Sequence, residues 1–151
     1  MTTQLDPKEY SAFLSGTRLC DLSIVELRSS RPRQLGELDI AVEHECVMRS
    51  PVSGPRFVVD FSARILTRLH SEEKADYEEC VSVAFEVVYE VNGGMPAQAL
   101  LDFFVEHNVS GHAWPYLREL VSSLTVRMNL PPLLLPFQII PMRVVGGSAE
   151  A

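Results

Sequence analysis

Apolar residues recur at every second position in three stretches of this chain. Across 38–48 the even positions are mostly apolar and the odd positions carry most of the acids. The same alternation runs through 56–68 and 80–91. It predicts β-strands that have one dry face and one wet face. A weaker pattern over 18–28 slips in phase at Ile24–Val25, which predicts a further strand with a β-bulge.

The connections and the second half of the chain set the fold class. No helical pattern separates the strands, so the predicted sheet is antiparallel, with a longer crossover over 29–35 after the first strand. Beyond Gly94 the apolar spacing predicts a short helix over 100–104 and a main helix from about Trp114 to Met128. The predicted class is α+β: a four-stranded antiparallel sheet with one main helix packed after the strands.

The length of 151 residues favours a single domain, 1–151. We expect 1–15 and 146–151 to be flexible ends. The stretch 130–141 contains four prolines and is otherwise mostly apolar. Prolines exclude a helix or a central strand there, so the stretch is expected to run extended against the domain.

Charge and composition exclude several classes of partner. The chain has 20 acidic residues against 13 Lys and Arg, for a net charge of −7. That balance argues against nucleic acid and against insertion at an anionic membrane. No apolar run approaches the ~18 residues of a membrane span, and the polar start does not resemble a signal peptide. Three scattered cysteines are typical of a reduced, cytoplasmic protein.

The sequence lacks the spacing of the common catalytic motifs, so we expect no enzyme activity, no cofactor and no metal. His44 and Cys46 share a predicted strand face, and Cys80 or Cys20 could complete a metal site. A buried cysteine and a hydrogen-bonded histidine are the favoured interpretation, because they are the commoner outcome.

An acidic belt over 72–106 carries nine carboxylates against one lysine. Within it, Asp102 and Glu106 lie one helical turn apart, and we interpret them as a solvated face rather than a general base. For the whole belt, solvation is the simplest interpretation, and a docking surface for a basic partner is the alternative.

The predicted sheet is larger than its helices can cover. Four strands of about ten residues make a sheet of roughly 19 by 33 Å, whereas a helix of ~17 residues covers roughly 25 by 10 Å. The remaining apolar surface is expected to bury against another copy or to bind something apolar. The predicted oligomer interface on the main helix comprises Trp114, Leu117, Leu120, Val121 and Leu124.

The main helix also carries a resemblance. The run Trp-Pro-Tyr-Leu-Arg-Glu at 114–119, followed by 120–127 and by Leu-Pro-Pro-Leu-Leu-Leu-Pro at 130–136, resembles the SecB-type export chaperones. The order of four strands, crossover and helix is similar along most of the chain. The family's long C-terminal helix is expected to be missing, because only ten residues follow Pro141.

The resemblance implies a cytoplasmic homotetramer, a dimer of dimers, that holds unfolded proteins in hydrophobic grooves without ATP. Family grooves are lined partly by the crossover and the start of the second strand. Apolar residues that are not buried within the fold itself are expected to complete the lining of the groove. The candidate client-binding residues are Leu35, Leu38, Ile40, Val42, Phe103, Phe104 and Tyr116.

The resemblance also implies a docking surface for the SecA ATPase on the wet face of the sheet, where Asp21 and Glu86 match. Val25 and Ala84 replace an acidic and an apolar position of that surface. Some members of the family instead guard the antitoxin of a toxin–antitoxin pair, so exported preproteins and an antitoxin both remain candidate clients.

Two other classes compete with an ATP-independent chaperone. One is an enzyme or hydrophobic-ligand carrier of the hot-dog kind, in which a sheet wraps a helix. That fold inserts its long helix among the strands, whereas the predicted main helix follows all four. The other is an oligomerisation module that has no client.

Overall fold

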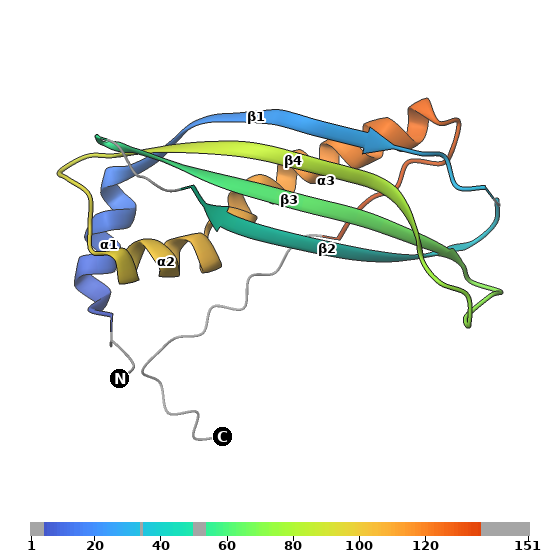
Figure 1. Ribbon diagram of the computed structural model, residues 1–151, viewed down its shortest axis with the longest axis horizontal. Coiled ribbons are helices and arrows are strands. Elements are labelled where there is room, and N and C mark those ends of the chain that lie inside the picture. Colours follow the sequence, from blue (N-terminus) through green and yellow to red (C-terminus); the bar gives the residue numbers. More distant parts are fainter. Residues whose placement is uncertain (1–4, 34, 50–53, 137–151) are drawn as a thin grey trace, which may run out of the picture.

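The computed structural model describes residues 5–33, 35–49 and 54–136 (Figure 1). In chain order the elements are α1 (Pro7–Gly16), β1 (Thr17–Ser29), β2 (Leu38–Met48), β3 (Arg56–Leu69), β4 (Glu78–Val91), α2 (Gln98–His107) and α3 (Val109–Arg127). The strands form one antiparallel sheet in the order β1-β4-β3-β2. The connection between β1 and β2 therefore crosses the two central strands. The predicted α+β class, sheet and crossover are confirmed.

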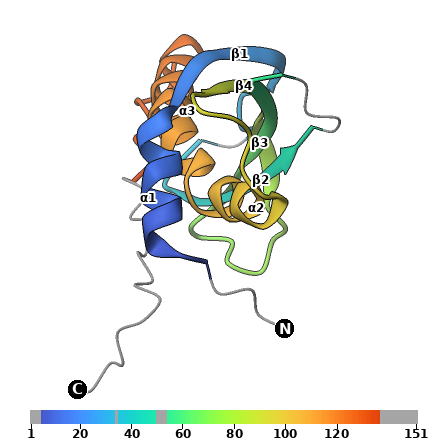
Figure 2. The same ribbon diagram turned by 90° about the vertical axis from the view of Figure 1, so that its left-hand side faces the viewer.

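The helices cover one face of the sheet, which we call the inner face. In β3 and β4 every second side chain is buried, with Phe61 and Phe85 stacked at a centroid distance of 6.0 Å. The intervening side chains form the outer face, which carries ion pairs such as Arg56–Glu90. Figures 1 and 2 show α2 and α3 on the same side of the sheet. The dry and wet faces read from the sequence are thus the inner and outer faces of the fold.

The predicted bulge in β1 is confirmed. The register against β4 shifts between Ile24 and Glu26, and a second shift lies between Leu19 and Asp21. Each extra residue bends and twists the strand locally. β1 therefore follows β4 along its length while its side chains change phase twice.

Within the N-terminal end that is expected to be flexible, the residues from Pro7 onward form the capped helix α1. Asp6 caps α1 by accepting the Lys8 N–H at 2.9 Å, and Pro7 stands in the first turn, where its missing N–H costs nothing. Phe13 is only 7% exposed, so the helix is anchored to the domain by an aromatic side chain. The other predicted flexible end, 146–151, lies outside the described residues.

The helical region begins earlier than its spacing predicted. α2 runs from Gln98 to His107, and Asn108 alone separates it from α3. Pro115 therefore lies inside α3. After α3 the described residues up to Pro136 contain no helix or strand, and Leu135 is 1% exposed. This agrees with the extended stretch predicted there, whose remainder up to Pro141 lies outside the described residues.

Candidate functional site

One backbone edge of β2 has no partner strand among the described residues. β2 lies at the end of the strand order and pairs with β3 in a register without a bulge. Hydrogen bonds from Arg49 N–H to Val58 O (2.9 Å) and from His70 N–H to Glu37 O (2.8 Å) extend this pairing at both ends. Paired positions alternate in an antiparallel ladder, so the odd-numbered residues bond to β3. The even-numbered residues therefore direct their N–H and C=O groups to the free edge.

The apolar client-binding candidates of the second strand follow this edge. Leu38, Ile40 and Val42 lie on the inner face and are half-buried, and Ile40 and Val42 pack against the core. Leu35, in the crossover just before β2, is 59% exposed. These four residues thus form a partly covered apolar strip along an unpaired strand.

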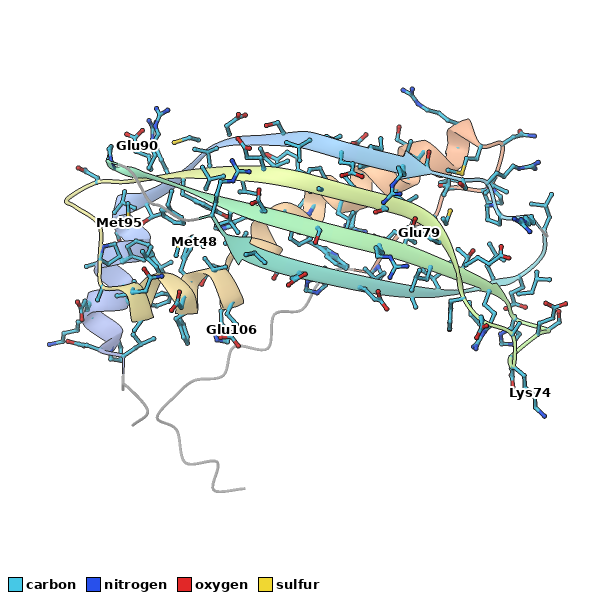
Figure 3. All side chains as sticks on the ribbon, in the orientation of Figure 1. Met48, Lys74, Glu79, Glu90, Met95 and Glu106 are labelled. Carbon is cyan, nitrogen blue, oxygen red and sulfur yellow. The ribbon has the colours of Figure 1, made fainter. Side chains whose placement is uncertain are left out.

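A cleft of about 790 Å³ continues the strip at the C-terminal half of β2. One wall is β2 and the other is α2 with the first turn of α3 (Figure 1). Figure 3 labels Met48 on β2 and Glu106 on α2, which stand on the two walls. The other lining residues are His44, Glu45, Cys46, Val47, Gln98, Asp102, Val105 and Ser110.

The cleft has an apolar floor and an acidic rim. Burial, with a smaller contribution from Glu45, raises the pKa of the Cys46 thiol to about 11, so the thiol stays neutral. Asp102 and Glu106 stand on the α2 wall together with Val105, which is buried. The lining contains no lysine or arginine. Such a cleft suits apolar side chains with positive charge at the rim.

Trp114 links β2 to α3 and to the segment that follows the helix. Its ring meets the edge of His44 at a centroid distance of 5.8 Å, and His44 stacks on Phe61. The indole Nε1–H donates to Pro136 O at 2.7 Å. Arg118 Nε–H donates to the carbonyl of Leu135, the residue before Pro136, at 2.7 Å. These bonds hold the chain after α3 against the helix.

The remaining client-binding candidates fall into different environments. Tyr116 is 49% exposed on α3, and Phe103 is half-buried. Phe104 is 1% exposed, because Phe13 covers it with rings 5.3 Å apart. Phe104 is therefore not accessible to a client in the conformation described, and its role in client binding stays a prediction.

Three of the five residues of the predicted oligomer interface are buried within their own chain. Trp114, Leu117 and Val121 are 7%, 0% and 0% exposed, because they pack against the sheet of their own chain. Leu120 and Leu124 are half-buried and remain candidates for contact with another copy. Exposed apolar side chains lie instead on β1 and at the end of α3, at Ile24, Val25, Leu27 and Val126.

Asp21 and Glu86 both lie on the outer face, as the alternation predicted. Asp21 is opposite Val88, and Glu86 is opposite Ser23. Glu86 forms an ion pair with Arg49 at 3.0 Å, whereas Asp21 is exposed. Their role in docking SecA stays a prediction.

A charged cluster at the start of β2 was missed in the sequence. Asp39 lies 3.1 Å from Arg68 and 2.7 Å from His70 Nδ1. Hydrogen bonding to Asp39 raises the pKa of His70, and the same bonds lower the pKa of Asp39. Arg68 also donates to Glu73 O and lies over the Tyr77 ring. Asp39 and Arg68 are cross-strand neighbours, so the register of the two strands would have revealed the pair.

A partly buried polar pair was missed as well. The Tyr89 hydroxyl lies 2.9 Å from His112 Nδ1, although Tyr89 is fully buried. Burial lowers the pKa of His112 and raises that of Tyr89, so both groups are held neutral. A neutral imidazole can accept a hydrogen bond from the phenolic O–H, which satisfies a buried donor.

The described residues offer no metal centre and no membrane span. No group of three or more His, Cys, Asp and Glu side chains within 5–33, 35–49 and 54–136 is arranged to hold a metal ion. Over the same residues, no helix combines the length and apolarity needed to cross a membrane.

No family model and no curated protein matches the sequence. Among solved structures, the fold is similar to that of the SecB-like chaperone Rv1957 of Mycobacterium tuberculosis, in complex with a ChAD peptide from the Rv1956 HigA1 antitoxin. The TM-score is 0.73 at 20% identity, over 89% of this chain and 100% of that chain. A protein of unknown function from Streptococcus agalactiae has a TM-score of 0.42 at 9% identity, over 80% of this chain and 97% of that one, and supports no argument. The chain therefore has the fold of a SecB-like chaperone.

Proposed function

We propose that this chain is an ATP-independent chaperone that binds extended, unfolded polypeptides in the cytoplasm. The observation that carries the proposal is the match in fold, along the whole of the other chain, to a SecB-like chaperone in complex with a peptide. The unpaired edge of β2 and the cleft beside it supply a surface on which such a peptide fits.

The apolar strip supplies the affinity. Burying one client leucine or phenylalanine side chain contributes ~1.5–3 kcal/mol. Several such contacts along Leu35, Leu38, Ile40 and the cleft reach about −8 kcal/mol, or micromolar binding, after the cost of ordering the client is subtracted. No single motif is required, so binding extends to many segments that are apolar and extended.

The free edge supplies a backbone partner. An extended client can add as a fifth strand, donating to and accepting from the even-numbered residues of β2. Val42 and Cys46 are such residues, and their side chains lie on the inner face opposite Ile65 and Phe61. Client side chains would then alternate between the cleft and the outer face.

Two features bear on the partners. The peptide in the similar structure comes from an antitoxin, which favours an antitoxin over exported preproteins as the client. The exposed apolar residues of β1, together with Leu120 and Leu124, fit contact with further copies in a homotetramer. Toxin and antitoxin reading frames beside the gene for this chain would support the first assignment.

The test is suppression of aggregation. A reporter enzyme is heated with an equal amount of this protein and without ATP, and light scattering is recorded. We expect scattering to fall in proportion to the protein added. Undiminished scattering at a several-fold excess would contradict the proposal, and an equal amount of serum albumin controls for crowding.

A further inference from the structure

α1 is attached to the domain through two aromatic side chains. Phe13 is buried and Tyr10 is half-buried, whereas residues 7–9, 11, 12, 14 and 15 are exposed. In the end-on view of Figure 2, α1 stands beside α2 at one end of the sheet, with its outer side in solvent. The helix therefore covers a small area with few contacts.

The surface beneath α1 is aromatic. The Tyr10 ring lies edge-on to Phe103 at 5.0 Å, and Phe13 lies edge-on to Phe104 at 5.3 Å. Phe104 in turn lies edge-on to Tyr89 at 5.0 Å. The Tyr10 hydroxyl donates to Asn108 Oδ1. Two aromatic side chains one turn apart thus fill a site that has aromatic walls and a polar group at its rim.

We propose that this site binds aromatic side chains of the client, and that Tyr10 and Phe13 occupy it when no client is present. α1 then acts as an internal substitute for the client and leaves the site when a client binds. The proposal rests on the proposed function, because it needs a client. It assigns Phe103 and Phe104 to a part of the surface that opens on binding.

The local structure allows α1 to leave. A helix of ten residues is shorter than the ~12–15 that an isolated helix needs, so α1 depends on its aromatic contacts. Its pivot is fixed, because Asn92 N–H donates to Gly16 O at 2.7 Å and a Cβ on Gly16 would meet Asn92 O at 2.9 Å. A client phenylalanine can replace each edge-on contact that is lost.

The experiment changes the stability of α1 without touching the site. Ala12→Gly lowers helix propensity and Ser11→Ala raises it, and both positions are exposed on the solvent side. The probe is a fluorescein-labelled nine-residue peptide with two phenylalanines in a glycine–serine–lysine background. We expect Ala12→Gly to tighten peptide binding up to about fivefold and Ser11→Ala to weaken it about twofold. The reason is that a less stable α1 leaves the aromatic site open in a larger fraction of the molecules.

Hydrogen exchange reads the movement directly. With saturating peptide, the α1 amides should lose protection while those of β3 and β4 keep it. Unchanged affinity in both variants, or α1 amides that stay protected, would overturn this proposal and leave the proposed function standing. If wild type and both variants bind no peptide and suppress no aggregation, the proposed function and this proposal both fail. Ser11→Ala keeps the test decisive even if Ala12→Gly fails to fold.

Discussion

The two edge strands of the sheet differ in what lies against their inner faces. On β1, Ile24 and Leu27 are 47% and 39% exposed on the face that the helices cover elsewhere. On β2, Ile40 and Val42 are half-buried, and α2 faces the end of the strand across a cleft. The apolar side of one edge is open, and that of the other is a partly walled groove.

The difference shows that the helices, rather than the strands, decide what each edge can do. Both strands place apolar side chains opposite buried residues of the neighbouring strand, such as Ile24 opposite Phe85 and Val42 opposite Ile65. A broad open face suits a second rigid surface that already matches it, such as another copy of the chain. A groove with an unpaired backbone edge suits a flexible strand. Breaking one edge should therefore leave the function of the other intact.

The largest effect is expected at β1. Leu27→Asp places a carboxylate on the open apolar face, and a buried unpaired carboxylate costs several kcal/mol. We expect the oligomer to dissociate, as measured by sedimentation velocity at micromolar concentration, and Leu120→Asp to act in the same way. Ser23→Asp, on the outer face of the same strand, is the matched control and should leave the mass unchanged. A wild-type protein that sediments as a monomer would end this assignment.

The next effect is expected at β2. Leu38→Ser combined with Ile40→Ser removes two side chains of the apolar strip, and each is worth roughly 1.5–3 kcal/mol when fully buried. We expect at least a tenfold loss of affinity for an unfolded client by calorimetry, with the oligomer intact. Val58→Ser, on the outer face of β3, serves as the control. Equal affinity in the double variant would place the clients elsewhere, for example on the Leu133–Ile140 stretch.

A smaller effect is expected at the acidic rim of the cleft. Asp102→Lys with Glu106→Lys reverses the charge of the α2 wall, and exposed ion pairs contribute ~0.2–1 kcal/mol each. A lysine-rich peptide should bind roughly twofold to tenfold more weakly, and the loss should shrink at high salt, because salt screens exposed charges. An uncharged peptide of the same apolar pattern should bind equally well to both proteins. Equal loss for both peptides would mean that the substitutions changed the shape of the cleft.

The smallest effects are expected from two histidines with opposite pKa shifts. Burial lowers the pKa of His112 in the folded state, so the unfolded state takes up more protons and stability falls as the pH drops below about 6.5. Asp39 raises the pKa of His70, so its contribution is complete below about 6.5 and is lost as the pH rises through the raised value. Urea midpoints between pH 5 and 8 separate the two groups. His112→Gln should flatten the acid side of the profile, and His70→Gln the neutral side.

Periodicity predicted the sheet well because it reports which face of an element is dry. The four strands and the bulge at Ile24–Val25 are visible in it. Periodicity does not show which surface covers that face and excludes water from it. Leu117 and Val121 lie on the apolar side of α3 whether the partner is the sheet of the same chain or another copy, and the structure places them in the core. α1 was missed because its large apolar side chains, Tyr10, Phe13 and Leu14, span little more than one turn, which is too short to show a helical period.

The candidate site was predicted in part for the same reason. The β2 strip is local in sequence, so Leu38, Ile40 and Val42 could be read directly. The cleft needs β2 and α2 together, and their wall residues lie some fifty positions apart. Which strand has an unpaired edge depends on the order of the strands in the sheet, and the alternation of apolar and polar residues does not reveal that order. Asp102 and Glu106 were correctly read as solvated charges, but their place opposite β2 was not foreseen.

The position of Trp114 makes the site optically visible. It is the only tryptophan in the chain, so the intrinsic fluorescence comes from one known place. Its ring touches His44 on β2, and its indole N–H is bound to Pro136 O. A peptide that pairs with β2, or a loosening of the segment after α3, would change the polarity around that ring. Emission wavelength can therefore follow client binding on an unlabelled protein, with stopped-flow time resolution.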